Sequence, residues 1–353
     1  MGLPEITVKF TTLANTAITR STRGAACVVV IDATKPNTIK RYTSKSAITA
    51  SDYTATNLAD IERMFLAAPS EVVVIAVSSK SDWAKAEAML NQNAWAWVCS
   101  NSSDLQTNIV TYLKNKNDAA KTKRYMGIVN TATAPDSAYI VNVPNTAVTE
   151  KGGTSVNIAN YLPRLCAILA AMPLDQSATY YELDDLIGVT AVADVDASID
   201  SGNMPIFDDD GIIRIGRGVT SLTTVKSGQS TTMKKIAVVE AMNMIFADII
   251  GTWKSAYCGK RKNTADNQAL FIGEVNKYFK KLGQDGVLSP DYDNVCDVDV
   301  DAQRAAWEAE GKDTSSWSNA QVKKMTYRAN VFIKGNIYIL DAMEDMTFSI
   351  VMQ

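Results

Sequence analysis

Ala26-Cys27-Val28-Val29-Val30-Ile31 is a continuous apolar run, mostly β-branched, and Val72-Val73-Val74-Ile75-Ala76-Val77 has the same character. Such runs are typical of strands that are buried on both faces of a parallel sheet. Three further runs are predicted to be strands: Trp95–Cys99, Tyr125–Val129 and Ala138–Val143. Stretches with helical spacing lie among the runs or follow them: Asn57–Leu66, Ser81–Asn91, Ser103–Asn115 and Tyr161–Met172. Because strands and helices alternate, the sequence predicts a mainly parallel α/β domain.

The second half of the chain has a different pattern, typical of an α+β domain. Its predicted elements are a strand at Ile212–Gly216, long helices at Thr232–Tyr257 and Thr264–Leu282, and short helices at Asp301–Glu310 and Val322–Arg328. Asp208-Asp209-Asp210-Gly211 predicts a turn before the strand. Gly283 is expected to end the second long helix, and Asp301 to cap the helix that it begins. Ser318-Asn319-Ala320-Gln321 has the form of a capping box.

Both ends of the chain alternate polar and apolar residues. Glu5–Phe10 and Met346–Met352 show the period of a half-buried β-strand. Chain ends are normally polar and frayed unless another element holds them. Two interpretations are equally compatible with this pattern. The terminal strands either close a sheet within the chain or pair with neighbouring molecules as strand-exchange arms.

The length of 353 residues predicts two domains or three. We predict an N-terminal arm and linker at 1–23, an α/β domain at 24–190, an α+β domain at 191–333 and a C-terminal arm at 334–353. The net charge of -3 argues against a general nucleic-acid-binding protein. No apolar run approaches the eighteen or more residues of a membrane span, and the N-terminus lacks the regions of a signal peptide. Synthesis in the cytosol is therefore expected.

The chain contains no histidine, which excludes a His-based catalytic triad and His-ligated metals. Its five cysteines are far apart and are predicted to be reduced thiols, mostly in the core. Gly216-Arg217-Gly218 and Lys151-Gly152-Gly153 do not fit a phosphate-binding loop, and Ile31–Pro36 has no glycine for a dinucleotide site. We therefore expect no catalytic residue and no cofactor.

Two acidic segments are candidate metal or acid–base sites. Asp291–Asp301 lacks the glycine and the final glutamate of a calcium-binding loop, so a strand with one solvated face is favoured over a metal site. Asp184-Asp185 is interpreted as solvated surface.

Two basic clusters remain. Lys260-Arg261-Lys262 follows the first long helix, where cations complement the helix dipole. Lys324 and Arg328 are four residues apart, and on a helix they would share a face with Gln321. On sequence alone a solvated face is favoured over a face that binds an acidic partner.

The chain resembles the contractile-tail sheath proteins of myophages and R-type bacteriocins, in the short form found in Gram-positive systems. The carrying segments are Gly2–Ile6, Thr16–Ile18, Arg20, Arg23-Gly24, Ile213–Ile215, Val219–Thr224, Gly335–Ile339 and Asp341–Met346. None of them is diagnostic alone. Their order and their placement at both ends and in the middle are specific, and they extend over essentially the whole chain.

The resemblance implies a structural subunit without a substrate, which forms stacked six-fold rings around a tail tube. Contraction would drive the tube through the target envelope. The implied partners are further copies of the chain, the tail tube protein, and the baseplate and tail-terminator proteins, with no direct contact to nucleic acid or membrane. The implied location is the host cytoplasm during assembly and then an extracellular tail particle. The α/β domain would lie outside and the α+β domain inside.

The resemblance also implies roles for particular residues. The terminal strands would add to sheets of neighbouring subunits, with these inter-subunit residues: Ile6, Val8, Phe10, Ile337, Ile339, Met346, Phe348 and Ile350. Flexible links at Thr11–Arg23 and Lys334–Asn336 would absorb the rotation of the subunits. A basic helix face would attach the sheath to the tube through Lys323, Lys324 and Arg328.

Two other classes of protein are alternatives to a sheath subunit. A cytosolic enzyme with a doubly wound nucleotide- or small-molecule-binding domain would need a Gly-rich βα turn or a convergent polar cluster, and the sequence shows neither. Another self-assembling protein, such as a capsid or tube component, is disfavoured by the α/β half.

Overall fold

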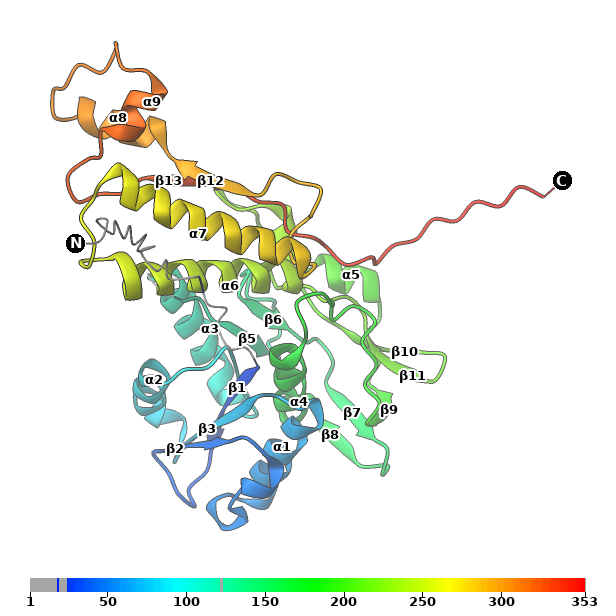
Figure 1. Ribbon diagram of the computed structural model, residues 1–353. Coiled ribbons are helices and arrows are strands. Elements are labelled where there is room, and N and C mark those ends of the chain that lie inside the picture. The colour runs from blue at the N-terminus through cyan, green and yellow to red at the C-terminus, as the bar shows by residue number, and fades with distance from the viewer. Residues whose placement is uncertain (1–17, 19–23, 121–122, 353) are drawn as a thin grey trace, which may run out of the picture. The chain divides into compact units, whose positions relative to one another are not determined.

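The computed structural model describes residues 18, 24–120 and 123–352 (Figure 1). The predicted N-terminal strand with Ile6, Val8 and Phe10 lies outside the described residues, as does the linker to Arg23 apart from Ile18. The described chain forms two compact units: a large unit of residues 24–247 and 339–352, and a small unit of residues 248–338. The chain passes from one unit to the other within a helix, and the predicted domain limits stay a prediction.

A six-stranded sheet forms the centre of the large unit, in the order β2-β3-β1-β4-β5-β6. Its strands are β1 (Ala25–Ile31), β2 (Thr38–Tyr42), β3 (Glu71–Val77), β4 (Trp97–Ser100), β5 (Met126–Val129) and β6 (Ile140–Asn142). Five strands are parallel, which confirms the prediction, and β2 pairs antiparallel with β3 at the edge. Strand β2 is not among the predicted strands, because its residues are mostly half-buried or exposed and form no apolar run.

The helices of the large unit explain why the strands are apolar on both faces. They are α1 (Ala55–Met64), α2 (Trp83–Gln92), α3 (Ser103–Asp118), α4 (Ile158–Ala171) and α5 (Val195–Asp200). Cys27 and Val29 of β1 belong to the apolar core that includes α2 and α3. Their neighbours Val28 and Val30 belong to the core that includes α1 and α4. Alternate residues of one strand therefore enter two separate cores.

The remainder of the large unit is antiparallel. Its strands are β7 (Ala147–Glu150), β8 (Ser155–Asn157), β9 (Leu186–Val189), β10 (Ile206–Asp209) and β11 (Ile212–Ile215). The first three form a sheet in the order β8-β7-β9, and the last two form a hairpin. Asp210 and Gly211 at its turn have positive φ angles, which confirms the predicted turn.

Helix α6 (Ile236–Thr252) contains the limit between the units and continues as a π-helical turn at Trp253–Tyr257. Among the described residues, Ile236–Tyr257 is the one helix with the length and composition to cross a membrane. This corrects the expectation that no apolar run is long enough. Half of the helix is buried inside the protein, and a core helix passes the same test.

The small unit contains α7 (Ala265–Gln284), β12 (Val295–Val298), α8 (Val300–Glu308), α9 (Asn319–Lys324) and β13 (Ile333–Asn336). The Tyr278 hydroxyl on α7 donates to Asp248 Oδ2 at 2.7 Å. Asn276 of α7 bonds both backbone groups of Cys296 on β12, at 2.7 and 3.1 Å. These contacts fix α7 against both the end of α6 and β12.

Several predicted boundaries in the small unit are wrong. Helix α7 continues past Gly283 to Gln284, and the glycine with a positive φ is Gly286. Asp299 caps α8 instead of Asp301, because its side chain accepts from Ala302 N. Lys334–Asn336 is no flexible link, since it lies in β13 and pairs antiparallel with β12.

Candidate functional site

The carboxyl ends of β1 and β4 are the first place to search for a ligand site. Strand β1 lies between β3 and β4, so the chain order reverses there. Open α/β sheets bind ligands at such a point. Asp32 follows β1 and Asn101 follows β4, which gives a convergent polar cluster that is not visible in the sequence.

These side chains bind each other. Asp32 is 1% exposed and accepts hydrogen bonds from Thr54 N at 2.7 Å and Asn57 Nδ2 at 2.8 Å. Asn101 Nδ2 donates to Asn57 Oδ1 at 2.7 Å and to Asp60 Oδ2 at 2.8 Å. Burial acts to raise the pKa of Asp32, but the hydrogen bonds from Asn57 and from the Thr54 and Thr34 backbone lower it to about 2. The network is structural: it joins the ends of the strands to α1.

Asp32→Asn is expected to lower the free energy of unfolding by about 2 kcal/mol at pH 7, because an amide cannot accept all the donors that the carboxylate accepts. Since the folded pKa of Asp32 is about 2 against an ordinary 3.8, its contribution is complete above about pH 5 and is lost as the pH falls towards 2. Urea unfolding at pH 7 and pH 3 measures both effects. An equal loss at both pH values would contradict the assignment.

The acidic pair Asp184-Asp185 is solvated surface only in part. The Asp184 side chain is 76% exposed, whereas that of Asp185 is 16% exposed. Asp185 Oδ2 accepts from the Tyr161 hydroxyl at 2.9 Å, and Asp185 Oδ1 lies 3.5 Å from Arg164 Nη2. Asp185 therefore neutralises a buried arginine. No group of three His, Cys, Asp or Glu side chains in the described residues is suited to hold a metal ion.

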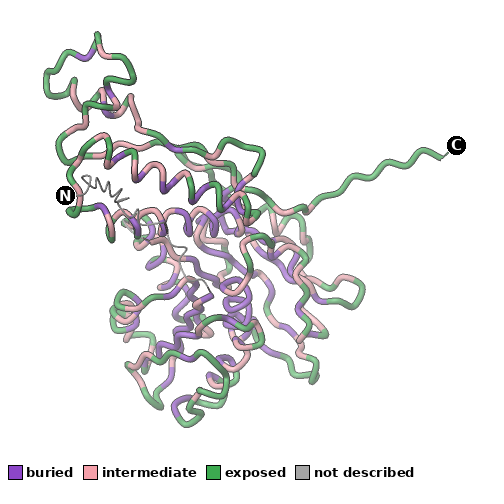
Figure 2. Tube along the Cα trace, in the orientation of Figure 1, coloured by how far each residue is buried: buried purple, intermediate pink, exposed green. Residues whose placement is uncertain are grey.

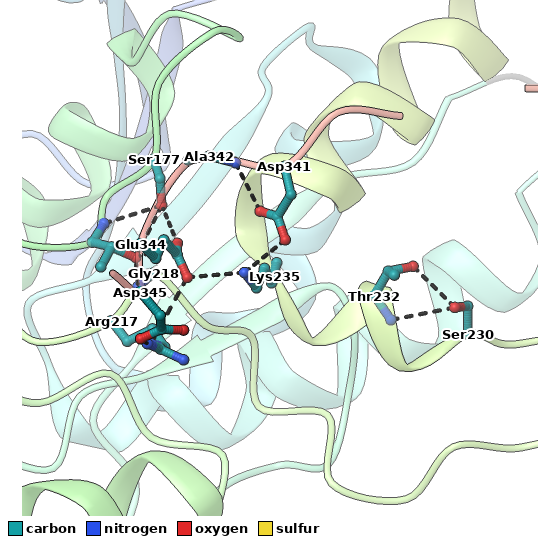
Figure 3. A network of polar contacts seen from close by, with 11 residues as sticks. Ser177, Arg217, Gly218, Ser230, Thr232, Lys235, Asp341, Ala342, Glu344 and Asp345 are labelled. Atoms are coloured by element: carbon teal, nitrogen blue, oxygen red, sulfur yellow. Dashed lines mark hydrogen bonds and ion pairs between the residues drawn. The ribbon is translucent and has the colours of Figure 1, made fainter. Parts of the chain in front are cut away.

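The C-terminal segment has a fixed point at Glu344 (Figure 3). The labelled side chains of Ser177 and Lys235 point toward it. The side chain of Glu344 is 4% exposed. It accepts hydrogen bonds from Thr179 Oγ1 at 2.6 Å, Ser177 Oγ at 3.0 Å and Lys235 Nζ at 2.9 Å. Lys235 Nζ also lies 2.6 Å from Asp341 Oδ2. We call residues 341–345 the anchor, because these contacts hold them to the large unit.

Electrostatics keep Glu344 of the anchor and its partner Lys235 charged. Burial acts to raise the pKa of Glu344, but the hydrogen bonds from Thr179, Lys235 and Ser177 outweigh it, so the pKa lies below its ordinary 4.5. Burial acts to lower the pKa of Lys235, but the hydrogen bonds to Asp341 and Glu344 outweigh it and raise the pKa. Arg217 adds a second cation 3.8 Å from Glu344 and pairs with Asp345.

Beyond the anchor the chain continues as an exposed apolar segment, residues 346–352, which we call the arm (Figure 2). Met346, Phe348 and Ile350 are 88%, 75% and 70% exposed. None of residues 346–352 is in a strand. Among the residues that the structure describes, this segment therefore closes no sheet. Ile337 and Ile339, which precede the anchor, are half-buried.

The predicted tube-attachment residues lie in the small unit around α9. The capping box is confirmed, because Ser318 and Gln321 bond each other's backbone groups. The helix ends at Lys324, however, and Arg328 has a φ of 43°, so Lys324 and Arg328 do not share a helix face. Lys323 pairs with Asp297, and Arg328 Nε lies 2.7 Å from Glu310 Oε1. Lys324 is exposed and has no ion-pair partner among the described residues.

Known proteins match the chain along its whole length. Residues 228–353 match the family model of the phage tail sheath C-terminal domain. The tail sheath protein of Clostridium phage phiCD119 is 27% identical over 366 aligned residues, which cover 99% of each chain.

Solved structures have the same fold. The contracted helical sheath of the anti-feeding prophage matches with a TM-score of 0.73 and 12% identity, over 100% of both chains. The sheath tail protein of Desulfitobacterium hafniense matches with a TM-score of 0.70 and 12% identity, over 83% of this chain and 93% of that one. The chain is thus similar over its whole length to tail sheath proteins of contractile injection systems.

Proposed function

We propose that the protein polymerises as stacked six-fold rings around a tail tube and contracts to drive the tube through a target envelope. The observation that carries the proposal is the arm, whose apolar residues are exposed directly after an anchor that is fixed to the large unit. A monomer gains nothing from such a segment, because exposed apolar area is unfavourable in water. A neighbouring copy with an open sheet edge could bury it by strand addition.

The strand pattern of the arm supports this partner. Met346, Phe348 and Ile350 are two residues apart, so they share one face when the segment is extended. We propose that the arm pairs with a neighbouring subunit, together with the predicted strand at Ile6, Val8 and Phe10. Ile337 and Ile339 stay predicted inter-subunit residues. Main-chain hydrogen bonds of this kind survive rotation of the subunits during contraction.

The proposal includes the particle around the sheath. The anti-feeding prophage relatives are sheath and baseplate assemblies. We propose that this chain likewise contacts further copies of itself and a baseplate, and in addition the tail tube and a tail-terminator protein. Assembly would take place in the bacterial cytoplasm and the particle would act outside the cell. An enzymatic activity is not part of the proposal.

The protein expressed alone tests the assembly proposal. Negative-stain electron microscopy and sedimentation are expected to show hollow, striated tubes. A uniform small particle at every salt and protein concentration would contradict the proposal.

We propose tube attachment through Lys323, Lys324 and Arg328 because they place positive charge beside the end of α9. The double variant Lys324→Glu, Arg328→Glu is expected to reduce extended, tube-bound sheath at least tenfold while sheath tubes still form without the tail tube, since like charges now face an acidic partner. Co-expression with the tail tube protein and electron microscopy measure both. Lys312→Glu, an exposed lysine of the same unit, is the control. If the amount of extended particles is unchanged, the attachment site is not at these residues, and Lys260–Lys262 is the next candidate.

A further inference from the structure

A cavity of ≈ 400 Å³ lies in the small unit where α6 ends. The rings of Trp253 and Tyr257 form part of its lining and are parallel, with centroids 6.1 Å apart. Phe271 supports both rings edge-on, at 5.1 and 4.8 Å. Trp253 and Tyr257 belong to the π-helical turn, an irregularity that is frequent at functional sites. The lining therefore offers a rigid aromatic surface of a size that holds a small ligand.

Cations border this aromatic surface. The guanidinium of Arg261 lies 5.1 Å from the centroid of the Tyr257 ring, and Lys262 is exposed beside it in the lining. Neither side chain has an ion-pair partner among the residues that the structure describes. Arg328 is a third cation of the lining, and Glu310 pairs with it. Two positive charges are thus available to an anion in the cavity.

The wall also contains polar atoms without partners. Tyr257 Oη and Gln268 Oε1 are buried and accept or donate no hydrogen bond within the described chain. Gln268 Nε2 donates to Asn263 Oδ1 at 2.7 Å, which fixes the orientation of the amide. Both oxygens are shielded from solvent inside the wall, so the binding surface consists of the aromatic rings and the two cations.

We propose that this cavity binds a carboxylate carried on an aromatic or aliphatic body. The body would lie against Trp253 and Tyr257, and the carboxylate would meet Arg261 and Lys262, since a guanidinium fork matches a carboxylate. An inorganic anion would leave the aromatic surface exposed, and a neutral apolar molecule would leave both cations unpaired. The same chemistry is present in a free organic acid and in an acidic residue beside an apolar one on another protein. The proposal does not depend on sheath assembly.

The thiol of Cys258 makes the test possible. Cys258 is exposed and lines the cavity, whereas Cys27, Cys99, Cys166 and Cys296 are buried. Alkylation of the full-length protein by iodoacetamide, followed by mass spectrometry, therefore reports how accessible the cavity is. The probes are 3-phenylpropionate, its neutral amide 3-phenylpropanamide, and the capped dipeptide acetyl-Glu-Phe-amide. The protection factor is the rate without probe divided by the rate with probe.

We expect 3-phenylpropionate at millimolar concentration to slow alkylation of Cys258 at least threefold, and its amide to leave the rate nearly unchanged. If only the dipeptide protects Cys258, the ligand is an acidic residue beside an apolar one on a protein partner. If only the free acid protects Cys258, the ligand is a small organic acid. Equal protection by acid and amide, or no protection by any probe, would overturn the proposal.

Variants of the cationic border complete the test. Arg261→Gln combined with Lys262→Gln is expected to reduce the protection factor to about one. The matched control is Lys260→Gln, because Lys260 is adjacent in sequence but does not line the cavity. Full protection in the double variant would overturn the role of the two cations, and circular dichroism confirms that each variant is folded.

Discussion

Replacing Met346, Phe348 and Ile350 by serine is expected to abolish tube formation and to leave a folded monomer. The three side chains are 70–88% exposed, so their removal costs the monomer almost nothing. In an assembled sheath each buried apolar side chain contributes about 1.5–3 kcal/mol, so each arm loses at least about 4 kcal/mol. That loss weakens each contact about a thousandfold. Electron microscopy and sedimentation measure assembly, and thermal unfolding measures the stability of the monomer.

The opposite face of the same segment provides the control. Thr347 and Ser349 are exposed and alternate with the three apolar residues. Thr347→Ala with Ser349→Ala keeps the length and the backbone of the arm, so tubes are expected to form as in the unaltered protein. Tubes of normal length from the triple serine variant would show that the arm does not hold subunits together.

The core of the sheet could be predicted because its signal is local. Val28, Val29 and Val30 enter apolar cores on alternating faces, so every residue of the strand must be apolar and the run is visible in the sequence. Strand β2 gives no such signal because Lys40 and Arg41 are exposed on the edge of the sheet. Lys334–Asn336 looks like a link, but it pairs with β12, from which α8 and α9 separate it in the chain.

The candidate site depends on contacts that sequence spacing does not reveal. The bonds of Glu344 to Ser177, Thr179 and Lys235 join residues that are 167, 165 and 109 positions apart. A glutamate in an exposed acidic stretch is normally solvated, and only the fold shows that this one is buried. The alternating pattern of the arm is visible in the sequence, but only the structure shows that residues 346–352 form no strand within the described part of the chain.

The anchor decides where the arm begins, so its loss is expected to have the second largest effect. Glu344→Gln keeps the size of the side chain but removes the charge that faces Lys235 and Arg217. A hydrogen bond to a charged group contributes about 1.5–3 kcal/mol, so the undocked population of residues 341–345 is expected to rise about tenfold to a hundredfold. An undocked anchor releases the arm from a fixed position, and tube formation falls because a flexible arm loses more entropy when it pairs.

Thermolysin digestion with mass spectrometry measures this population. The enzyme cleaves before apolar residues, so cleavage before the half-buried Ala342 reports undocking, while cleavage before the exposed Phe348 serves as an internal reference. The ratio of the two rates is expected to rise at least tenfold in Glu344→Gln. In Asp345→Asn it is expected to rise less than threefold, because the side chain of Asp345 is 79% exposed and surface ion pairs are weak. Equal ratios in Glu344→Gln and the unaltered protein would show that Glu344 does not hold the anchor.

The same ratio has a defined pH dependence. The folded pKa of Glu344 is below its ordinary 4.5, so its contribution is complete above about pH 5 and is lost as the pH falls through the folded value. The folded pKa of Lys235 is above its ordinary 10.5, so its contribution is complete below about pH 10 and is lost as the pH rises through the folded value. Between about pH 6 and 9 the cleavage ratio of the unaltered protein is therefore expected to stay constant. A steep change in the cleavage ratio between about pH 6 and 9 would mean that a group other than Glu344 or Lys235 controls the docking of the anchor.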